Sequence, residues 1–439
     1  MIRTKTAAVL ACVLTASTVA LAACGNDPAP TAPQTVAESG MKLDADYSGA
    51  GQVPGALISA SVLPTVDRRL RSSTSLAARV EYTSTSGITD GHTPVSGTVF
   101  VPKGKPPQGG WPILAYGHGT TGVAPDCGPS LSQTLLGSSL IIQALVNEGY
   151  LVTMPDYQGL GMEGTYHPYL DSTTAGYNMI DAVRAARKLV PAASNKWVAL
   201  GLSQGGQAAW AANELNANYG SDLDLRGSVS LSPPTDLTDF ATEAAAGTLN
   251  KDQRPALQLI LHSLKNAYSD FNLDDYRRGI VESKWDVLSA CQGPLVSERK
   301  AVTSQISADD LRPSSPEAVA MLKGYLQKMS LPQGPTAAPM LVIYGDKDSL
   351  LPVAWTDRAV EAACQMGDVI EIEAQRGKDH GDIDQSRAFP WIQERFAGAP
   401  PAQNNCATFV PGAEQSESGD DTSTEPTSAQ LESVRGDGS

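Results

Sequence analysis

Residues 198–212 read Val-Ala-Leu-Gly-Leu-Ser-Gln-Gly-Gly-Gln-Ala-Ala-Trp-Ala-Ala, which joins an apolar run to a helix-forming run. A Gly-x-Ser-x-Gly pentapeptide centred on Ser203 separates the two. This order predicts a strand, a tight turn and a helix, with the serine hydroxyl exposed on a strained turn at the sheet edge. The flanking glycines are expected because a Cβ would collide with the strand or helix packed beside the turn. A pentapeptide arises by chance, so features elsewhere in the chain must support this interpretation.

Short apolar segments alternate with helical patterns on both sides of this stretch. Such alternation predicts an α/β fold, the α/β-hydrolase type, with a mostly parallel central sheet flanked by helices. Pro191 ends a long amphipathic helix, and residues 91–94 predict a turn ahead of a strand. The expected strands are 77–84, 95–102, 112–116, 150–156, 198–202, 227–232, 340–344 and 369–372, and the expected helices outside the insertion are 140–148, 173–190 and the one after Ser203.

The alternation lapses between Pro233 and Pro339. A long segment there separates two strands that need only a short crossover, and connections of that length are usually functional insertions. The pattern within it is helical. We therefore predict one α/β-hydrolase domain over residues 46–411, with an inserted helical cap at about 235–335 above the sheet edge. Within the cap, helices are expected at 257–267, 274–284 and 316–328.

The two ends of the chain differ from this body. Residues 1–23 carry a positive start and an apolar stretch, and residues 21–24, Leu-Ala-Ala-Cys, predict a lipoprotein signal with lipidation at Cys24. An ordinary cleaved signal is the alternative. Residues 24–45 are predicted to be a flexible tether rich in Pro, Ala and Thr, and residues 412–439 an acidic disordered tail. The sequence thus predicts an exported protein that is a cell-membrane lipoprotein or is secreted.

The amino-acid composition limits the kinds of partner that the protein is expected to bind. The formal net charge of −15 argues against nucleic acid, which needs a basic face. We expect contact with the membrane only through the lipid anchor, and we favour a monomer. Metal-ligand spacing and phosphate-cradling loops are absent from the sequence, so neither metal nor cofactor is predicted. Four cysteines follow the predicted signal and Cys24: Cys127, Cys291, Cys364 and Cys406. In an exported protein they suggest two disulfides, for which three pairings are possible.

A nucleophilic serine needs a base, a group that orients the base, and donors for the oxyanion. On this fold the chain order is serine, acid, histidine, each at the carboxyl end of a strand. Ser203 is followed by His262, in the predicted cap, and by His380, in the loop after strand 369–372. His380 is therefore the predicted base. Asp346 and Asp348 compete for the acid; we choose Asp348, which can turn back towards the active face, whereas Asp346 more plausibly caps the turn.

The oxyanion donors are expected to be backbone N–H groups. One belongs to Gln204, the residue after the nucleophile, and the other to the loop after strand 112–116. Thr120 is our choice within that loop, with Thr121 as the alternative. His118, in the same loop, is interpreted as a structural turn residue.

Three motifs together resemble the secretory lipase family, which includes fungal lipases of the lipase A type and actinobacterial lipases. They are Tyr-Gly-His-Gly-Thr-Thr-Gly at 116–122, Pro-Asp-Tyr-Gln-Gly-Leu-Gly at 155–161 followed by His-Pro-Tyr at 167–169, and Gly-Leu-Ser-Gln-Gly-Gly at 201–206. The resemblance implies acyl-ester hydrolysis without a cofactor, a helical cap, and a triad of Ser203, Asp348 and His380. It also implies the disulfides Cys127–Cys291 and Cys364–Cys406. Fungal members place an acidic residue where this chain has threonines.

The hypothesis is therefore a lipase or carboxylesterase that cleaves small-molecule or lipid esters through an acyl-enzyme. An acyltransferase that uses the same triad on a cell-envelope acceptor is the alternative, and a non-catalytic surface lipoprotein is a more remote one. The acyl chain length is expected to depend on the lining of the cap.

Overall fold

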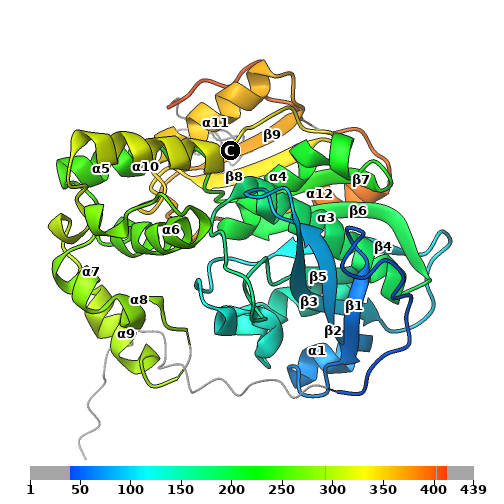
Figure 1. Ribbon diagram of the computed structural model, residues 1–439. Helices are drawn as coiled ribbons and strands as arrows, with labels where there is room; N and C mark the ends of the chain where they lie inside the picture. Colours follow the sequence, from blue (N-terminus) through cyan, green and yellow to red (C-terminus); the bar gives the residue numbers. More distant parts are fainter. Residues whose placement is uncertain (1–39, 292, 402, 413–439) are drawn as a thin grey trace, which may run out of the picture. The chain divides into compact units, whose positions relative to one another are not determined.

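A nine-stranded sheet forms the centre of the computed structural model, which describes residues 40–291, 293–401 and 403–412. Its order is β1-β2-β3-β5-β4-β6-β7-β8-β9 (Figure 1). Strands β1 to β3 pair antiparallel with one another, and β3 pairs antiparallel with β5; the remaining pairs are parallel. The strands are β1 (Leu57–Val62), β2 (Thr74–Thr85), β3 (His92–Pro102), β4 (Trp111–Gly117), β5 (Leu151–Pro155), β6 (Ala193–Leu202), β7 (Asp224–Leu231), β8 (Met340–Gly345) and β9 (Ile370–Gln375).

Helices cover both faces of this sheet, as the parallel strands require. Helices α3 (Ser172–Leu189), α4 (Gln204–Tyr219) and α11 (Val353–Gln365) pack on one face, and α1 (Arg68–Ser73), α2 (Ser139–Asn147) and α12 (Ala388–Phe396) on the other. Strand β4 shows the alternation: Ile113 and Ala115 join the core under α3 and α4, whereas Leu114 joins the core under α2 and α12. The predicted mostly parallel α/β architecture is confirmed.

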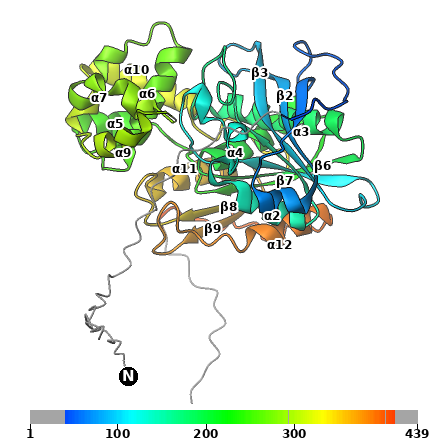
Figure 2. The same ribbon diagram turned by 90° about the horizontal axis from the view of Figure 1, so that it is seen from below.

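Six α-helices of the described part of the chain lie between β7 and β8. Figures 1 and 2 show them gathered beside the sheet rather than against either of its faces. They share one hydrophobic core with part of α11, including Phe240, Leu261, Leu322 and Trp355. This helical insertion, here called the cap, comprises α5 (Asp239–Ala246), α6 (Gln253–Ala267), α7 (Gly279–Ser283), α8 (Trp285–Ser289), α9 (Val296–Thr303) and α10 (Pro316–Met329).

Two predicted elements were wrong. Residues 92–94 belong to β3 instead of a turn, because Thr93 pairs with Ser84 of β2 and His92 with Thr85. The helix expected at 274–284 is broken into a short 3-10 turn (Leu273–Asp275) and α7. Gly279 adopts a φ of +57°, a left-handed conformation that cannot continue an α-helix.

The described part of the chain begins with residues that pair with the sheet. Gly40 and Leu43 donate backbone hydrogen bonds to Val62 and Ala60, so residues 40–45 continue the sheet edge instead of forming the end of a tether. The predicted signal, the lipidation site Cys24 and nearly all of the acidic tail lie outside the described residues. Within the described ranges, every helix is too short or too polar to cross a membrane.

Candidate active site

Ser203 stands on the turn between β6 and α4. Its φ of +54° and ψ of −122° are strained for a residue with a side chain, and its N–H donates to the carbonyl of Leu231 at 2.8 Å. The chain can turn this tightly because both flanking glycines lie against backbone. A Cβ on Gly201 would collide with Gly205, and a Cβ on Gly205 would collide with the carbonyl of Gly117. The glycines thus allow the turn that exposes the serine hydroxyl.

His380 lies in the loop after β9, directly against Ser203. Its Nε2 is 2.9 Å from Ser203 Oγ, and its Nδ1 is 2.7 Å from a carboxylate oxygen of Asp348. The backbone carbonyl of His380 accepts a hydrogen bond from Ser232 Oγ at 3.0 Å. The fold therefore brings the three residues predicted to form the triad into one hydrogen-bonded row.

The Asp348 side chain is held from its other side. Its Oδ1 accepts backbone N–H bonds from Leu350 and Leu351 at 2.9 and 2.8 Å, while Oδ2 faces His380. The side chain is only 3 % exposed. Asp346, the competing acid, instead accepts the N–H of Gly377 at 2.6 Å and joins the loops after β8 and β9. The geometry thus puts the Asp348 carboxylate, and not that of Asp346, against the imidazole.

Gln204 and Thr120 occupy positions suited to oxyanion donors. Gln204 is the first residue of α4, and the first N–H groups of a helix have no intrahelical partner. Thr120 follows β4, and its Oγ1 lies 2.8 Å from the hydroxyl of Tyr169. The Oγ1 of Thr121, the alternative donor residue, is buried without a hydrogen-bond partner among the described residues. The assignment of Gln204 and Thr120 remains a prediction.

A buried histidine next to this site was missed in the sequence analysis. His167 Nδ1 lies 2.9 Å from the carbonyl of Gln158, and its Nε2 lies 2.9 Å from the side-chain Nε2 of Gln204. Burial lowers the pKa of His167 to about 3, so the ring is neutral. Its Nδ1–H donates to Gln158, and its Nε2 accepts from Gln204. The His-Pro-Tyr motif was the available signal, because both its histidine and Tyr169 hold candidate oxyanion residues.

His118 is buried below the turn. Its Nδ1 lies 2.7 Å from the carbonyl of Gly119 and its Nε2 3.3 Å from that of Asp156. Burial lowers the pKa of His118. A neutral ring carries one N–H, so it donates to only one of these two carbonyls. His262 lies in α6, where it stacks on Trp285. Neither ring is bonded to Ser203.

A small apolar cavity adjoins Ser203. Its volume is about 10 Å3, which is roughly the space that one water molecule needs. Loops of the sheet and helices of the cap form its wall, so the cap adjoins the nucleophile. The lining residues besides Ser203 are Tyr169, Leu170, Pro234, Phe240, Ala256, Leu350 and Leu351.

Two disulfides are present, Cys127–Cys291 and Cys364–Cys406, the pairing that the family resemblance implies. The first ties the segment after the 116–122 loop to the cap, and the second ties α11 to the chain after α12. In the described part of the chain, the acidic, histidine and cysteine side chains close enough to share a metal ion are Asp126, Cys127 and Cys291. Two of these are disulfide sulfurs, whereas metals bind thiolates.

The strand order, the strained serine turn and the helices on both faces define an α/β-hydrolase fold. Within that class the chain belongs to the secretory lipase family, whose sequence model matches residues 130–404. A Mycobacterium tuberculosis protein described as a probable inactive lipase is 26% identical over 340 residues, covering 72% of each chain. Lipase 10 of Candida albicans is 27% identical over 318 residues, covering 65% of each chain.

Solved structures share the fold. Candida antarctica lipase A in its closed state superposes with a TM-score of 0.66 at 19% identity, over 84% of this chain and 89% of that one. The rice cell wall degrading esterase LipA of Xanthomonas oryzae gives a TM-score of 0.60 at 21% identity, over 79% of this chain and 96% of that one. Family and fold together support ester hydrolysis, and the family supports export.

Proposed function

We propose that this protein is a serine carboxylic ester hydrolase that works through an acyl-enzyme on Ser203. The observation that carries the proposal is the row of hydrogen bonds from Ser203 Oγ through His380 to Asp348, at 2.9 and 2.7 Å. A serine hydroxyl is a weak nucleophile unless a base takes its proton, and His380 Nε2 lies at the distance that this transfer requires.

Each of the three residues has one task in the proposed reaction. Ser203 Oγ attacks the ester carbonyl while His380 Nε2 takes the hydroxyl proton, and Asp348 stabilises the resulting imidazolium. The same proton then goes to the departing alcohol as the C–O bond breaks. A water molecule, deprotonated by His380, then attacks the acyl-enzyme. The bond between the acyl carbon and Ser203 Oγ breaks, Oγ takes the proton back from His380, and the acid leaves.

The negative charge on the carbonyl oxygen needs donors during both attacks. We assign them to the backbone N–H groups of Gln204 and Thr120, each worth roughly 3 kcal/mol of transition-state stabilisation. Tyr169 holds the side chain of Thr120, and His167 holds that of Gln204. These contacts support the assignment, because donors fixed in advance need no reorganisation when the charge forms.

A non-catalytic protein is the competing function, and the relative described as a probable inactive lipase favours it. Against it, the serine, the histidine and the acid are all present here and bonded to one another. We further propose that the chain acts outside the cell membrane, held by lipid on Cys24, and that its substrate is a small-molecule or lipid ester.

The test is hydrolysis of p-nitrophenyl esters from acetyl to palmitoyl, with and without added alcohols as competing acyl acceptors. We expect turnover by the wild-type protein and a loss of roughly 10³-fold or more in Ser203→Ala. Release of free acid as the main product supports a hydrolase, whereas predominant transfer to the alcohol in dilute aqueous mixtures would identify an acyltransferase. Absence of turnover on every ester by folded wild-type protein would contradict both.

A further inference from the structure

The cap contains a second hollow, between α6 and α9, with a volume of about 690 Å3. This lies within the range of small-molecule sites in proteins. Its apolar lining includes the buried side chains of Leu288 and Ile306, together with Pro255 and Val296, which is 40% exposed. Four cationic side chains also line it: Lys251, Arg254, Arg299 and Lys300. The hollow is here called the cap groove.

The positive charge of the cap groove is largely uncompensated. Arg254 donates to the carbonyls of Leu249 and Ile306, both at 2.9 Å, and Arg299 donates to the carbonyl of Ala290 at 2.9 Å. Within the described ranges, no carboxylate pairs with either guanidinium or with Lys300. Asp252, the one acid in the lining, is bonded to Lys251 at 3.1 Å. On a chain with a formal net charge of −15, such a local excess of cations is unusual.

Partial burial makes the charges of Arg254 and Arg299 costly, because charges removed from water are normally paired. Burial lowers the pKa of Arg299, as expected for a guanidinium without a carboxylate partner. An anion in the cap groove would supply that partner, and guanidinium groups bind carboxylates through paired N–H bonds. The apolar lining would at the same time cover an alkyl chain.

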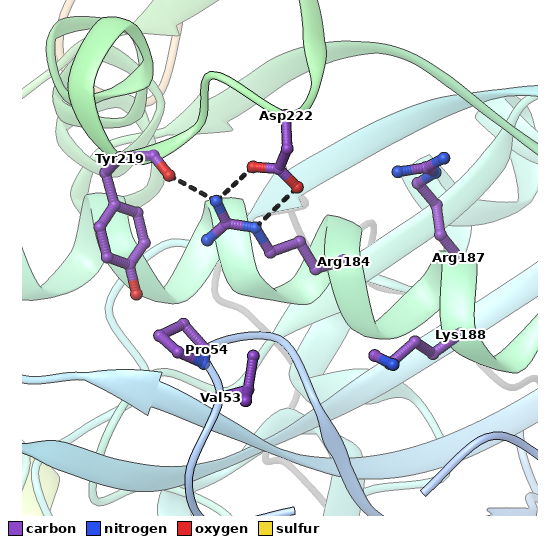
Figure 3. A pocket seen from close by; sticks show the side chains of 7 residues that line it. All are labelled: Val53, Pro54, Arg184, Arg187, Lys188, Tyr219 and Asp222. Carbon is purple, nitrogen blue, oxygen red and sulfur yellow. Dashed lines mark hydrogen bonds and ion pairs between the residues drawn. The ribbon is translucent and has the colours of Figure 1, made fainter. Parts of the chain in front are cut away.

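In another hollow on the protein, two of the cations are paired with carboxylates. Between α3 and the segment of Val53 and Pro54, Arg184 faces Asp222 and the backbone carbonyl of Tyr219 (Figure 3). Arg184 also pairs with Asp181 at 2.8 Å, and Lys188 pairs with Asp46 at 2.8 Å. Carboxylates there already pair with Arg184 and Lys188, and the third cation of that lining, Arg187, is exposed to solvent, so that hollow gives less reason to expect an anionic ligand.

We propose that the cap groove binds a free fatty acid, with the carboxylate at its cationic rim and the alkyl chain along its apolar lining. Helix α6 places the groove beside the candidate active site: Ala256 lines the cavity at Ser203, and the adjacent Pro255 lines the groove. Asp252 also accepts a hydrogen bond from Ser349, the residue after Asp348, at 3.1 Å. The choice of a fatty acid as occupant rests on the proposed ester hydrolysis, because a fatty acid is the product of that reaction. The charge and shape of the groove are independent of the proposed reaction.

The test is calorimetric titration of the full-length Ser203→Ala protein with octanoate, octanol and acetate. We expect one octanoate per chain, with an affinity that falls as salt is added, and binding at least about tenfold weaker for octanol, which lacks the charge, and for acetate, which lacks the chain. Octanol that binds as tightly as octanoate, or no binding of octanoate, would overturn the proposal. Because this protein lacks Ser203, the outcome is independent of whether the wild type hydrolyses esters.

Substitutions localise the site. Lys300→Ala removes an exposed cation of the groove, and Arg299→Gln removes a charge while keeping a donor for Ala290. Each is expected to weaken octanoate binding by about threefold or more, and the double variant by about tenfold. Lys323→Ala, an exposed cap lysine outside the groove, should leave binding unchanged. If the folded double variant binds octanoate as tightly as the Ser203→Ala protein without these substitutions, the fatty acid binds elsewhere and the proposal is refuted.

Discussion

His167 Nε2 lies 2.9 Å from the side-chain nitrogen Nε2 of Gln204, the residue that follows the candidate nucleophile. The contact has a defined direction, because His167 is neutral and donates through its other nitrogen to Gln158. It fixes the first residue of α4, whose backbone N–H we assign to the oxyanion. We therefore expect His167 to be a positioning residue that acts through Gln204.

Replacement of His167 by alanine should lower kcat by roughly tenfold or more, because a small misplacement of an oxyanion donor is costly, with a smaller effect on KM. The shape of the pH profile should stay as in the wild type, since a ring with a pKa of about 3 does not titrate near neutral pH. Steady-state kinetics from pH 6 to 9 measures both. His262→Ala, which removes a cap histidine, is the control. An unchanged kcat in folded His167→Ala would show that Gln204 needs no such support.

The two acids after β8 should behave differently. Asp348→Asn should lower kcat/KM by roughly 10³-fold or more, because the imidazolium then loses its stabilising carboxylate. Asp346→Asn should cost less than about tenfold, since the Asp346 carboxylate accepts the N–H of Gly377 in the neighbouring loop and does not face His380. Parallel kinetics on the same ester compares them. The reverse order of effects would mean that Asp346 is the acid.

Phe240 should restrict the acyl group. It lines the cavity of about 10 Å3 beside Ser203 and packs edge-on against Trp355, with ring centroids 4.9 Å apart. Phe240→Ala should therefore raise the ratio of kcat/KM for octanoyl over acetyl esters by about tenfold. Phe271→Ala removes an equally buried ring of the cap outside this cavity and is the matched control. A ratio that is unchanged in Phe240→Ala, or that rises equally in Phe271→Ala, would contradict this role.

Glu214 should make folding stability depend on pH. Burial, with a further contribution from Asp368, raises its pKa to about 8 from the ordinary 4.5. Between these values the folded chain holds a proton that the unfolded chain has lost, so the free energy of unfolding should fall as pH rises. The slope is roughly 1.4 kcal/mol per pH unit within this window.

Glu214→Gln should flatten that decline, because the amide does not titrate. Denaturant unfolding at intervals from pH 5 to 8 measures the slope, and Glu361→Gln on the exposed side of α11 is the control. If Glu214→Gln loses stability with pH as steeply as the wild type, another group is responsible.

The parts of the fold with a strong period in the sequence were predictable. The buried parts of the parallel strands are continuous apolar runs, and β4 and β8 lie where those runs predicted them. Strand β6 contains the predicted run 198–202 but begins earlier, at Ala193, through a polar segment. The strands near the edge of the sheet were harder to predict. His92, Thr93 and Pro94 have the composition of a turn, yet pairing with β2 holds them in a strand, a long-range effect that local sequence does not carry.

The row from Ser203 to His380 was predictable because the fold dictates an order along the chain, and few histidines follow the serine. The contacts of His167 were not predictable, because the fold does not dictate where along the chain a buried histidine outside the triad must lie. Its partner Gln204 is 37 residues away, and only the folded chain brings them together. The cap groove was likewise hidden, since Arg254 and Arg299 come from different helices and look like ordinary surface cations in the sequence.

The proposed reaction requires Ser203 to be the nucleophile of an acyl-enzyme. Mass spectrometry of the protein after reaction with a fluorophosphonate measures this directly, with residual ester hydrolysis followed in the same samples. One adduct on the peptide that contains Ser203, with activity lost in proportion to labelling and no adduct in Ser203→Ala, is the predicted result. An unlabelled Ser203 in folded protein, or ester hydrolysis that persists in Ser203→Ala, would contradict the claim.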